Sequence, residues 1–470
     1  MSFKTYALED VLEITSSKRI KMADYVQSGI PFYRSKEIIE KSNNQPVSTD
    51  IFITCEHFDK IKMKFGAPEA GDILLTSVGT LGVSYQVSDD DLFYFKDGNL
   101  TWFRNFNNRV LSGYIYCWLK SPSARKKLDE ISIGTTQRAL RIASLKKILI
   151  KIPSLDVQKK IVFIYESLSK KIINNGKINQ TLEQMAQVLF KSWFVDFEPV
   201  KAKIAVLEAG GSQEDATRAA MTAISGKDAD ALAVFEREHP EQYAQLKATA
   251  ELFPAAMQDS ELGAIPKGWG VASISEMGKV TCGKTPSKKE PEYYGSDVPF
   301  IKIPDMHGQL FVLKTNEYLS EAGSKSQLKK LVPANSICVS CIATIGVVSI
   351  TNEPSHTNQQ INSVTPHKSS LLYYLYFCML GLKDHLHILG SAGSATLNVN
   401  TSTFSGIKIA QPDAKVLELF HAKCTHLFNE IKSLSVQTES LTQLRDTLLP
   451  KLLSGEITLP EAEQIISEEA

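Results

Sequence analysis

Residues 156–196 have the hydrophobic spacing of a single long amphipathic helix. Their apolar side chains recur every three or four residues, a period that predicts a stripe facing another helix. The stripe consists of Ile161, Ile164, Leu168, Ile172, Ile178, Leu182, Met185, Leu189 and Trp193, with Asn175 on the same line. Pro153 precedes the stretch and Pro199 follows it, which bounds a helix of about 40 residues and roughly 60 Å. A helix of this length is either a coiled-coil arm or a spacer between two bodies.

The same stripe occurs again 259 residues later. The shifted positions are occupied by Phe420, Lys423, Leu427, Ile431, Gln437, Leu441, Leu444, Leu448 and Leu452, of which seven are apolar. Pro153 obeys the same shift, because it corresponds to Pro412. Two ungapped copies predict that the helices pair with each other, since neither buries its stripe alone. Any two amphipathic helices can be aligned in this way. Whether the stripes belong to a true repeat therefore depends on the segments that precede them.

The segments that precede the two helices repeat as well. Residues 29–38 match residues 297–306 at a shift of 268, and residues 71–83 match residues 335–347 at a shift of 264. Cys117 corresponds to Cys378 at a shift of 261. The shift falls steadily toward 259, as an ordered repeat with small loop deletions requires. The chain is therefore predicted to run body, long helix, connector, body, long helix.

This order predicts an α+β fold in which two pseudo-repeated, β-rich mixed domains are separated by two long antiparallel coiled-coil helices. Short apolar runs such as 73–78 and 83–87 predict strands, residues 111–127 predict a helix, and the connector predicts three more helices. The expected boundaries are 1–153 for the first body, 154–200 for the first long helix, 201–264 for a helical acidic connector, 265–412 for the second body, 413–456 for the second long helix and 457–470 for an acidic tail. The tail is expected to add little to the fold.

Composition indicates an ordinary globular protein, with 43% hydrophobic and 22% charged residues. The N-terminus shows no signal peptide, and the longest apolar run, residues 371–382, is too short to cross a bilayer. Seven scattered cysteines fit reduced thiols in a cytoplasmic protein. Cys338 and Cys341 have a zinc-like spacing, but no second pair accompanies them.

The formal net charge of zero argues against indiscriminate binding of nucleic acid, but the charge is unevenly distributed. Residues 125–151 contain eight Lys or Arg against two Asp or Glu. Residues 201–261 reverse this balance, with eleven Asp or Glu against six Lys or Arg. The first body therefore has a basic region, and the connector is acidic.

One motif matches a phosphate-binding loop letter for letter. Residues 278–285, Gly-Lys-Val-Thr-Cys-Gly-Lys-Thr, fit the pattern G-x-x-x-x-G-K-[ST]. That loop binds phosphate only when a buried strand precedes it and a helix follows it. Pro286 follows at once, and residues 287–291 cannot form a helix of any length. We interpret the match as accidental, with an NTPase kept as the alternative function.

Other catalytic motifs are missing from the sequence. It has no G-x-G-x-x-G opening a βαβ unit, no N-P-P-Y/F or D-P-P-Y/F tetrapeptide for base methylation, and no H-E-x-x-H metal motif. These absences favour a chain that recognises or organises other molecules. A coiled-coil scaffold that does not bind DNA is a second alternative.

Polar and basic loops at equivalent places in both bodies favour nucleic acid as the partner. Such loops combine cations for phosphates with amides, guanidinium groups and hydroxyls that can read base edges. Each loop alone also fits a solvated turn, but their coincidence in two repeats favours function. The candidates in the first body are Lys18, Arg19, Lys21, Tyr33, Arg34, Lys36, Thr135, Thr136, Gln137, Arg138 and Arg141. Those in the second body are Lys284, Thr285, Lys288, Lys289, Lys302, Ser394, Thr396, Asn398 and Asn400.

Several segments resemble the specificity subunits of type I restriction–modification enzymes, and the resemblance covers nearly the whole chain. It rests on residues 190–200 (Phe-Lys-Ser-Trp-Phe-Val-Asp-Phe-Glu-Pro-Val), 265–269 (Ile-Pro-Lys-Gly-Trp) and 448–457 (Leu-Leu-Pro-Lys-Leu-Leu-Ser-Gly-Glu-Ile). Residues 283–287 (Gly-Lys-Thr-Pro-Ser), followed by Tyr293-Tyr294 and Val-Pro-Phe-Ile at 298–301, also look like that family's domain opening. The first body departs from the pattern, because it lacks the Gly-x-Thr-Pro-Ser form.

The resemblance implies that each body is a target recognition domain for one half of a bipartite, asymmetric site in double-stranded DNA. The paired helices would fix the unread spacer between the half-sites. Catalysis would belong to partners: two modification subunits that use S-adenosylmethionine, and restriction subunits that use ATP and Mg²⁺. This chain would be non-catalytic and cytoplasmic, with no cofactor of its own and no membrane contact. Trp193, Phe194, Leu449 and Leu452 would be docking surfaces for the partners.

Overall fold

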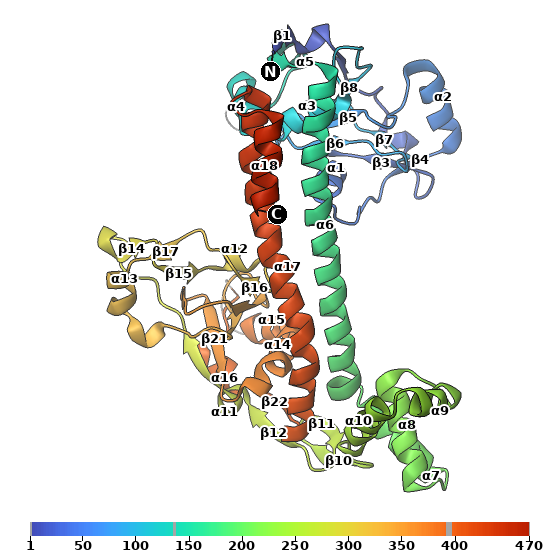
Figure 1. Cartoon of the computed structure of the whole chain (residues 1–470), viewed down its shortest axis with the longest axis vertical. Helices are drawn as coiled ribbons and strands as arrows, with labels where there is room; N and C mark the ends of the chain where they lie inside the picture. The colour runs from blue at the N-terminus through green and yellow to red at the C-terminus, as the bar shows by residue number, and fades with distance from the viewer. Residues whose placement is uncertain (1, 135–137, 392–396, 470) are drawn as a thin grey trace. The chain divides into compact units, whose positions relative to one another are not determined.

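The computed structural model describes residues 2–134, 138–391 and 397–469, and it divides into two compact units (Figure 1). Unit 1 combines residues 1–177 with 437–470, and unit 2 is the segment 178–436. Two long helices contribute to both units, α6 (Leu155–Phe190) and α17 (Ala414–Ser454). Each unit therefore contains one body and part of each long helix, and unit 2 also contains the connector.

The two long helices form as predicted and pair antiparallel. In unit 1, the Arg445 guanidinium lies 5.9 Å from the Tyr165 ring centroid, and Asn175 Nδ2 donates to Gln437 Oε1 at 2.8 Å. In unit 2, Asn179 Nδ2 donates to Ser435 Oγ at 3.0 Å. Within unit 2 the rings of Phe190 and Phe420 are also neighbours, with centroids 6.2 Å apart. Residue numbers rise along α6 as they fall along α17, which confirms the antiparallel pair.

The side chains of the predicted stripe are buried or half-buried, except at two positions where the prediction is wrong. Ile161, Ile164 and Leu168 are buried in unit 1, whereas Ile178 and Met185 are 37% and 55% exposed in unit 2. A straight helix has 3.6 residues per turn, so its buried line drifts away from a strict seven-residue spacing. In unit 2 the line therefore passes to Ala186, which is fully buried.

The first body contains three small sheets. The sheets have strand orders β1-β9, β2-β8-β5-β6 and β4-β3-β7. The strands are β1 (Lys4–Ala7), β2 (Glu13–Thr15), β3 (Ile30–Tyr33), β4 (Phe52–Ile53), β5 (Ile73–Thr76), β6 (Ser84–Gln86), β7 (Tyr94–Phe95), β8 (Leu100–Arg104) and β9 (Leu149–Ile152). The helices are α1 (Ser35–Ser42), α2 (Cys55–Phe65), α3 (Ser112–Leu119), α4 (Pro122–Ile131) and α5 (Ile142–Lys146). The apolar core under the largest sheet is continuous with the stripes of α6 and α17 in unit 1.

The helix predicted for residues 111–127 is in fact two helices, α3 and α4. Ser121 caps the second, because its Oγ accepts a hydrogen bond from the Ala124 amide at 3.2 Å. Pro122 occupies the first turn of α4, where its missing N–H costs nothing. The hydrophobic spacing continues from α3 into α4, so it does not indicate where one helix ends and the next begins. The pair Ser121-Pro122 marks that boundary.

The second body repeats the design with longer strands. Its sheets have orders β12-β22, β13-β21-β18-β19-β16 and β14-β17-β15-β20. The strands are β12 (Gly270–Ser273), β13 (Gly278–Cys282), β14 (Tyr294–Gly295), β15 (Val298–Ile301), β16 (Phe311–Val312), β17 (Tyr318–Leu319), β18 (Ile337–Ser340), β19 (Val348–Thr351), β20 (His356–Thr357), β21 (Ile361–Pro366) and β22 (Lys408–Gln411). The helices are α11 (Ile274–Met277), α12 (Ile303–Met306), α13 (Glu321–Ser326), α14 (Leu372–Gly381), α15 (Lys383–Ser391) and α16 (Thr401–Gly406).

The element bounds confirm the predicted repeat. Strand β3 corresponds to β15 at the predicted shift of 268, and β5 corresponds to β18 at 264. At the predicted shift of 259, α5 corresponds to α16 and β9 to β22. Each pair of strands also has the same kind of neighbour, for example β3 with β7 and β15 with β20, both parallel.

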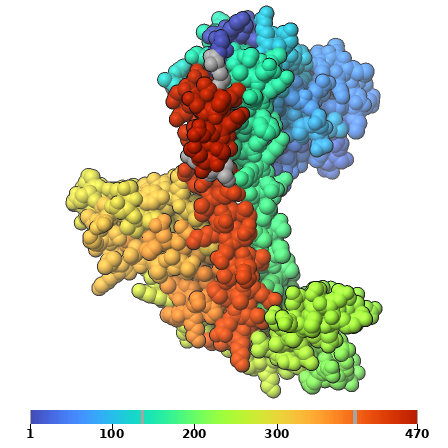
Figure 2. All heavy atoms as spheres, in the orientation of Figure 1, coloured from blue at the N-terminus to red at the C-terminus, as the bar shows by residue number. Residues whose placement is uncertain are grey.

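The connector is helical and builds a small core of its own in unit 2. Its atoms gather in one green lobe in Figure 2. Ala220, Met221, Leu232 and Ala250 are the buried members of that core. The helices are α7 (Glu198–Glu208), α8 (Gln213–Ser225), α9 (Ala229–Glu238) and α10 (Pro240–Glu251), and a hairpin of β10 (Met257–Ser260) and β11 (Gly263–Pro266) comes after them.

The C-terminal tail has a larger structural role than expected. Residues 459–469 form α18 (Leu459–Glu469), an amphipathic helix. Leu459 and Ala462 are buried in the core of unit 1. The acidic composition of the tail concealed these apolar positions, which lie three residues apart on one face.

Two further structural observations concern metals and membranes. Cys338 and Cys341 lie in and just after β18, where burial raises the pKa of each thiol to about 11. Among the described residues, no group of three or more His, Cys, Asp and Glu side chains could hold a metal ion. In the same part of the chain, no helix combines the length and the apolarity that crossing a membrane needs.

Candidate nucleic-acid interface

Four loops of the first body meet at one edge. The Lys18 amide donates to the Tyr94 hydroxyl at 2.8 Å, so the loop after β2 lies against the β7–β8 turn. That turn is bonded to the loop after β5, because the Ser77 amide donates to the Asn99 carbonyl at 2.8 Å. The Leu140 amide in turn donates to the Ser77 carbonyl at 2.9 Å. Residues 16–21, 77–79, 96–99 and 138–141 therefore form one connected surface.

The second body has a corresponding edge, and two of the three hydrogen bonds that join its segments match those of the first body. The Lys284 amide donates to the Thr357 carbonyl at 2.9 Å, which joins the loop after β13 to the end of β20. The Cys341 amide donates to the Gln360 carbonyl at 2.8 Å, and the Val399 amide donates to the Cys341 carbonyl at 2.9 Å. The participating segments are 283–289, 341–343, 358–361 and 397–400. We call this surface in either body the loop edge.

The backbone of the loop edge is alike even where the residue types differ. The Gly79 amide donates to the Arg138 carbonyl, and the Ala343 amide donates to the Leu397 carbonyl. Gly79 and Ala343 both have positive φ, +78° and +63°. A non-glycine residue rarely adopts this conformation without a reason. The two bodies therefore present different side chains on a common frame.

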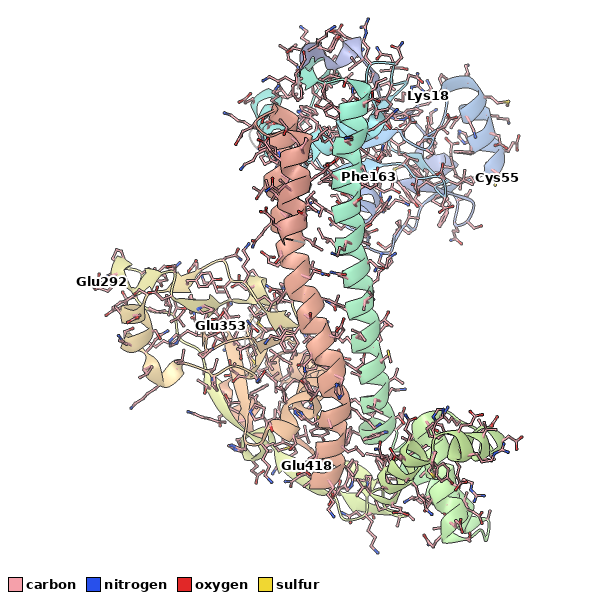
Figure 3. The ribbon with its side chains drawn as sticks, viewed as in Figure 1. Lys18, Cys55, Phe163, Glu292, Glu353 and Glu418 are labelled. Atoms are coloured by element: carbon pink, nitrogen blue, oxygen red, sulfur yellow. The ribbon has the colours of Figure 1, made fainter. Side chains whose placement is uncertain are left out.

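Most of the predicted cations lie on the loop edge and are exposed. Lys18, labelled in Figure 3, extends from the first body, with its ammonium 5.1 Å from the Phe65 ring centroid. No ion pair among the described residues neutralises these side chains. They are Lys18, Arg19, Lys21 and Arg141 in the first body and Lys284, Lys288 and Lys289 in the second. Unpaired cations of this kind suit contacts with phosphates.

Three other predicted residues lie beside the loop edge and are held by the protein itself. Tyr33 is buried and stacks on Phe93 with centroids 4.5 Å apart, so its prediction as a contact residue is wrong. Arg34 donates to Glu37 at 2.7 Å, and this hydrogen bond raises the pKa of its guanidinium. Lys302 forms an ion pair with Glu317.

Of four further predicted residues, two are held by contacts within the protein and two are exposed. Arg138 is tied to Asp129 at 3.0 Å, and Asn400 caps α16 by accepting from the Thr403 amide at 2.9 Å. Lys36 is exposed and lies 3.8 Å from Glu40, and Asn398 is exposed on the loop edge. The predicted residues Thr135, Thr136, Gln137, Ser394 and Thr396 lie outside the described residues.

Sequence reasoning missed the turn that joins the predicted loops. In the second body this turn is Asn358-Gln359-Gln360, and in the first it is Lys96-Asp97-Gly98-Asn99. Thr285 Oγ1 donates to Gln359 Oε1 at 2.6 Å, which ties the missed turn to a predicted loop. A run of three amides, Asn358-Gln359-Gln360, directly before the strand that starts at Ile361 is the signal that could have revealed it.

A buried histidine supports the second loop edge from behind. His356 is fully buried, its Nε2 lies 2.9 Å from Ser324 Oγ, and burial lowers its pKa. Gln327, which neighbours His356, donates from Nε2 to the Lys284 carbonyl at 3.0 Å. The basic loop therefore rests on a neutral polar cluster that needs no counter-ion.

The segment resembling a phosphate-binding loop has the wrong surroundings for that function. Residues 278–282 are β13, which pairs antiparallel with β21. The next helical element after Lys284 is a single 3₁₀ turn at Pro291–Tyr293. No α-helix N-terminus therefore faces the loop, and the NTPase alternative is not supported.

The residues predicted to bind partner subunits are buried inside the chain. Trp193 lies in a short π-helical segment (Lys191–Val195), is fully buried, and has its ring centroid 5.1 Å from that of Phe253. Phe194 packs on Tyr374 and Phe420, each 5.0 Å away. Leu449 and Leu452 belong to the core of unit 1. These side chains stabilise the units, so their prediction as docking surfaces is wrong.

Other apolar side chains of α6 are exposed. Ile178, Met185 and Val188 are 37%, 55% and 68% exposed in unit 2. Steps of seven and three residues place them on one face of the helix. Phe163, labelled in Figure 3, is likewise exposed on the part of α6 that belongs to unit 1.

Comparison with known proteins gives consistent matches. Residues 2–184 and 266–433 each match the family model described as "Type I restriction modification DNA specificity domain". The chain is 42% identical to the type I restriction enzyme HindI specificity subunit of Haemophilus influenzae, over 88% of this chain and 93% of that protein. It is 26% identical to the MjaIX specificity subunit of Methanocaldococcus jannaschii, over 83% and 78% of the two chains. The crystal structure of an M. genitalium type I S subunit shares the fold, with a TM-score of 0.53, 13% identity and 96% of each chain covered.

Proposed function

Because this chain belongs to the specificity subunits of type I restriction–modification enzymes, we propose that each of its bodies reads one half of a bipartite, asymmetric site in double-stranded DNA. The observation that carries the proposal is the loop edge, which occurs in both bodies with the same backbone hydrogen bonds. Its unpaired cations would hold phosphates, and its variable polar side chains would contact base edges in the major groove.

If each body recognises one half-site, a mutation in one body should change only the half-site that this body recognises. Replacing residues 393–400 should change or abolish the half-site read by the second body, while the first half-site keeps its sequence. Mapping methylated sites in cells that express the complete system measures both halves at once. Simultaneous change of both half-sites would contradict independent readers, and an unchanged second half-site would remove this segment from the interface.

We further propose that catalysis and its cofactors belong to partner subunits in the cytoplasm. Two modification subunits would supply S-adenosylmethionine-dependent methylation, and restriction subunits would supply ATP- and Mg²⁺-dependent cleavage. In support, the catalytic motifs for these reactions are missing from the sequence. The exposed stripe of Ile178, Met185 and Val188 suits a partner helix.

The partner surface can be tested without disturbing the cores. Met185→Glu combined with Val188→Glu should prevent assembly with the modification subunits, because two charges would be buried in an apolar contact. Gln184→Glu combined with Gln187→Glu adds the same charge at exposed neighbouring positions and serves as the control. Size-exclusion chromatography of co-expressed subunits measures assembly. Normal assembly of the Met185/Val188 variant would exclude this stripe.

A further inference from the structure

The Gln359 side chain is held in a defined orientation on the second loop edge. Its Oε1 accepts a hydrogen bond from Thr285 Oγ1 at 2.6 Å, while the residue itself is exposed. The carbonyl end of the amide therefore faces the protein, and the two N–H donors of Nε2 remain for an external acceptor. No hydrogen bond to a described residue uses those donors.

The turn that carries Gln359 is rigid. Asn358 Nδ2 donates to Gln360 Oε1 at 3.0 Å, and the Gln360 amide donates to Asn358 Oδ1 at 3.1 Å. Gly283 lies directly against the turn, since a Cβ there would be 2.1 Å from the Asn358 carbonyl oxygen. A pre-organised side chain loses little conformational entropy on binding, which favours selective contacts.

Exposed cations flank Thr285 on the loop that contacts this amide. Lys284 precedes Thr285 directly, and Lys288 and Lys289 follow it within four residues. Cations of this kind bind phosphates and fix the register of a duplex, but they carry no sequence information. A polar group oriented among them is placed to contact a base edge.

We propose that Gln359 is a specificity-determining residue of the second body and that it recognises a guanine through its major-groove edge. Guanine presents two acceptors there, N7 and O6, whereas adenine presents one acceptor and one donor. An unrestrained glutamine pairs with adenine, because it offers both a carbonyl and an N–H. The hydrogen bond from Thr285 uses one lone pair of the Gln359 carbonyl oxygen and turns that oxygen toward the protein, so the outward end of the amide presents donors and the preference moves to guanine. This inference rests on the DNA-reading function proposed above.

The matching turn in the first body supports a role in discrimination. The Asn358 amide donates to the Ile301 carbonyl, and the Lys96 amide donates to the Tyr33 carbonyl in the same way. The Ser77–Asn99 and Cys341–Gln360 bonds also match, so the first turn is one residue longer, and Asp97 and Gly98 together take the place of Gln359. A carboxylate is an acceptor, whereas the restrained amide is a donor. The two turns thus differ in hydrogen-bonding character, as readers of two different half-sites require.

The experiment maps methylated sites in cells that express the full system with wild-type chain, Gln359→Ala or Thr285→Val. With Gln359→Ala, one position of the second half-site should lose its guanine preference by about tenfold or more. With Thr285→Val, the freed carbonyl should move the same position toward adenine. Gln213→Ala, an exposed glutamine in α8, is the control and should leave the motif unchanged.

The outcomes separate this inference from the proposed function. If the wild-type system yields a bipartite motif that both variants reproduce with unchanged selectivity, Gln359 does not read a base. If both half-sites broaden together, the effect is not base reading by one body, which also overturns the inference. A wild-type chain that yields no bipartite motif would overturn the proposed function itself. Should Gln359→Ala abolish methylation, Thr285→Val decides, because it keeps the side chain and changes only its hydrogen bonding.

Discussion

Lys120 is a half-buried cation without a carboxylate partner among the described residues. Its Nζ donates to the Ser84 carbonyl at 2.9 Å and to Ser42 Oγ at 3.0 Å. Burial, with a smaller contribution from the charge of Arg445, lowers its pKa to about 8. The folded state therefore releases this proton at lower pH than the unfolded chain does. The unfolded state binds more protons above pH 8, so the free energy of unfolding must rise with pH there.

We predict that this rise disappears in the Lys120→Met variant. Between pH 7.5 and 9.5, the free energy of unfolding of the wild type should increase relative to the variant by about 1.5 kcal/mol. Urea denaturation at a series of pH values measures it. Lys126→Met removes an exposed lysine of α4 and is the matched control. A wild-type curve parallel to that of Lys120→Met would show that Lys120 titrates normally.

Single side chains explain which of the predicted cations are exposed. The sequence shows that Lys18 and Lys284 are charged, and on exposed loops nothing nearby competes for them. It does not show that Arg34 meets Asp50, because that contact depends on the fold. Gln359 was missed for a related reason. Its role depends on Thr285, which is 74 residues away along the chain.

At the scale of elements, a polar pair interrupts the apolar seam of the long helices. Asn175 is 4% exposed and donates to Gln437, with buried Leu168 and Leu441 on the same seam. Buried polar pairs in coiled coils favour one register, because any shift leaves each amide without its partner. We infer that this pair fixes the register of α6 against α17 in unit 1.

A double-mutant cycle tests that role. Asn175→Leu or Gln437→Leu alone should each destabilise unit 1 by roughly 1–3 kcal/mol, because a buried amide loses its partner. The double variant should recover most of this loss, which gives a coupling energy of about 1 kcal/mol or more. The exposed Glu166–Lys170 pair on α6 is the control, with expected coupling below about 0.5 kcal/mol. A coupling energy near zero between Asn175 and Gln437 would show that this pair does not fix the register and that apolar packing alone does so.

The elements themselves were largely predictable, because periodicity and repetition are properties of the sequence. The 259-residue shift located both long helices, and drifting shifts located the bodies. The errors arose where local chemistry interrupts a pattern. Pro122 splits one expected helix, and Leu459 anchors a tail that its acidic composition made look unimportant to the fold.

At the scale of the whole molecule, the long helices are the elements that the two units share. Residues 155–177 of α6 belong to unit 1 and residues 178–190 to unit 2, and α17 is divided in the same way. The two bodies are therefore connected through the long helices, and the length of these helices is a property that a mutation can change. The proposed function makes that length the determinant of the spacer between half-sites.

We predict that inserting four residues after Asn179 lengthens the spacer that the complex accepts. Four residues add about 6 Å to a helix, close to two base pairs, and rotate the remainder of α6 by about 40° beyond a full turn. Some affinity should therefore be lost, while both half-sites keep their sequences.

The antiparallel pairing of Asn179 with Ser435 supplies a stronger version of this test. A matched insertion of four residues after Leu434 lengthens α17 at the same level, so neither helix is left without its partner. The doubly extended chain should accept the longer spacer with higher activity than the chain extended in α6 alone. Mapping methylated sites for the three chains reports spacer and half-sites together. An unchanged spacer at full activity in the doubly extended chain would mean that these helices do not set the distance.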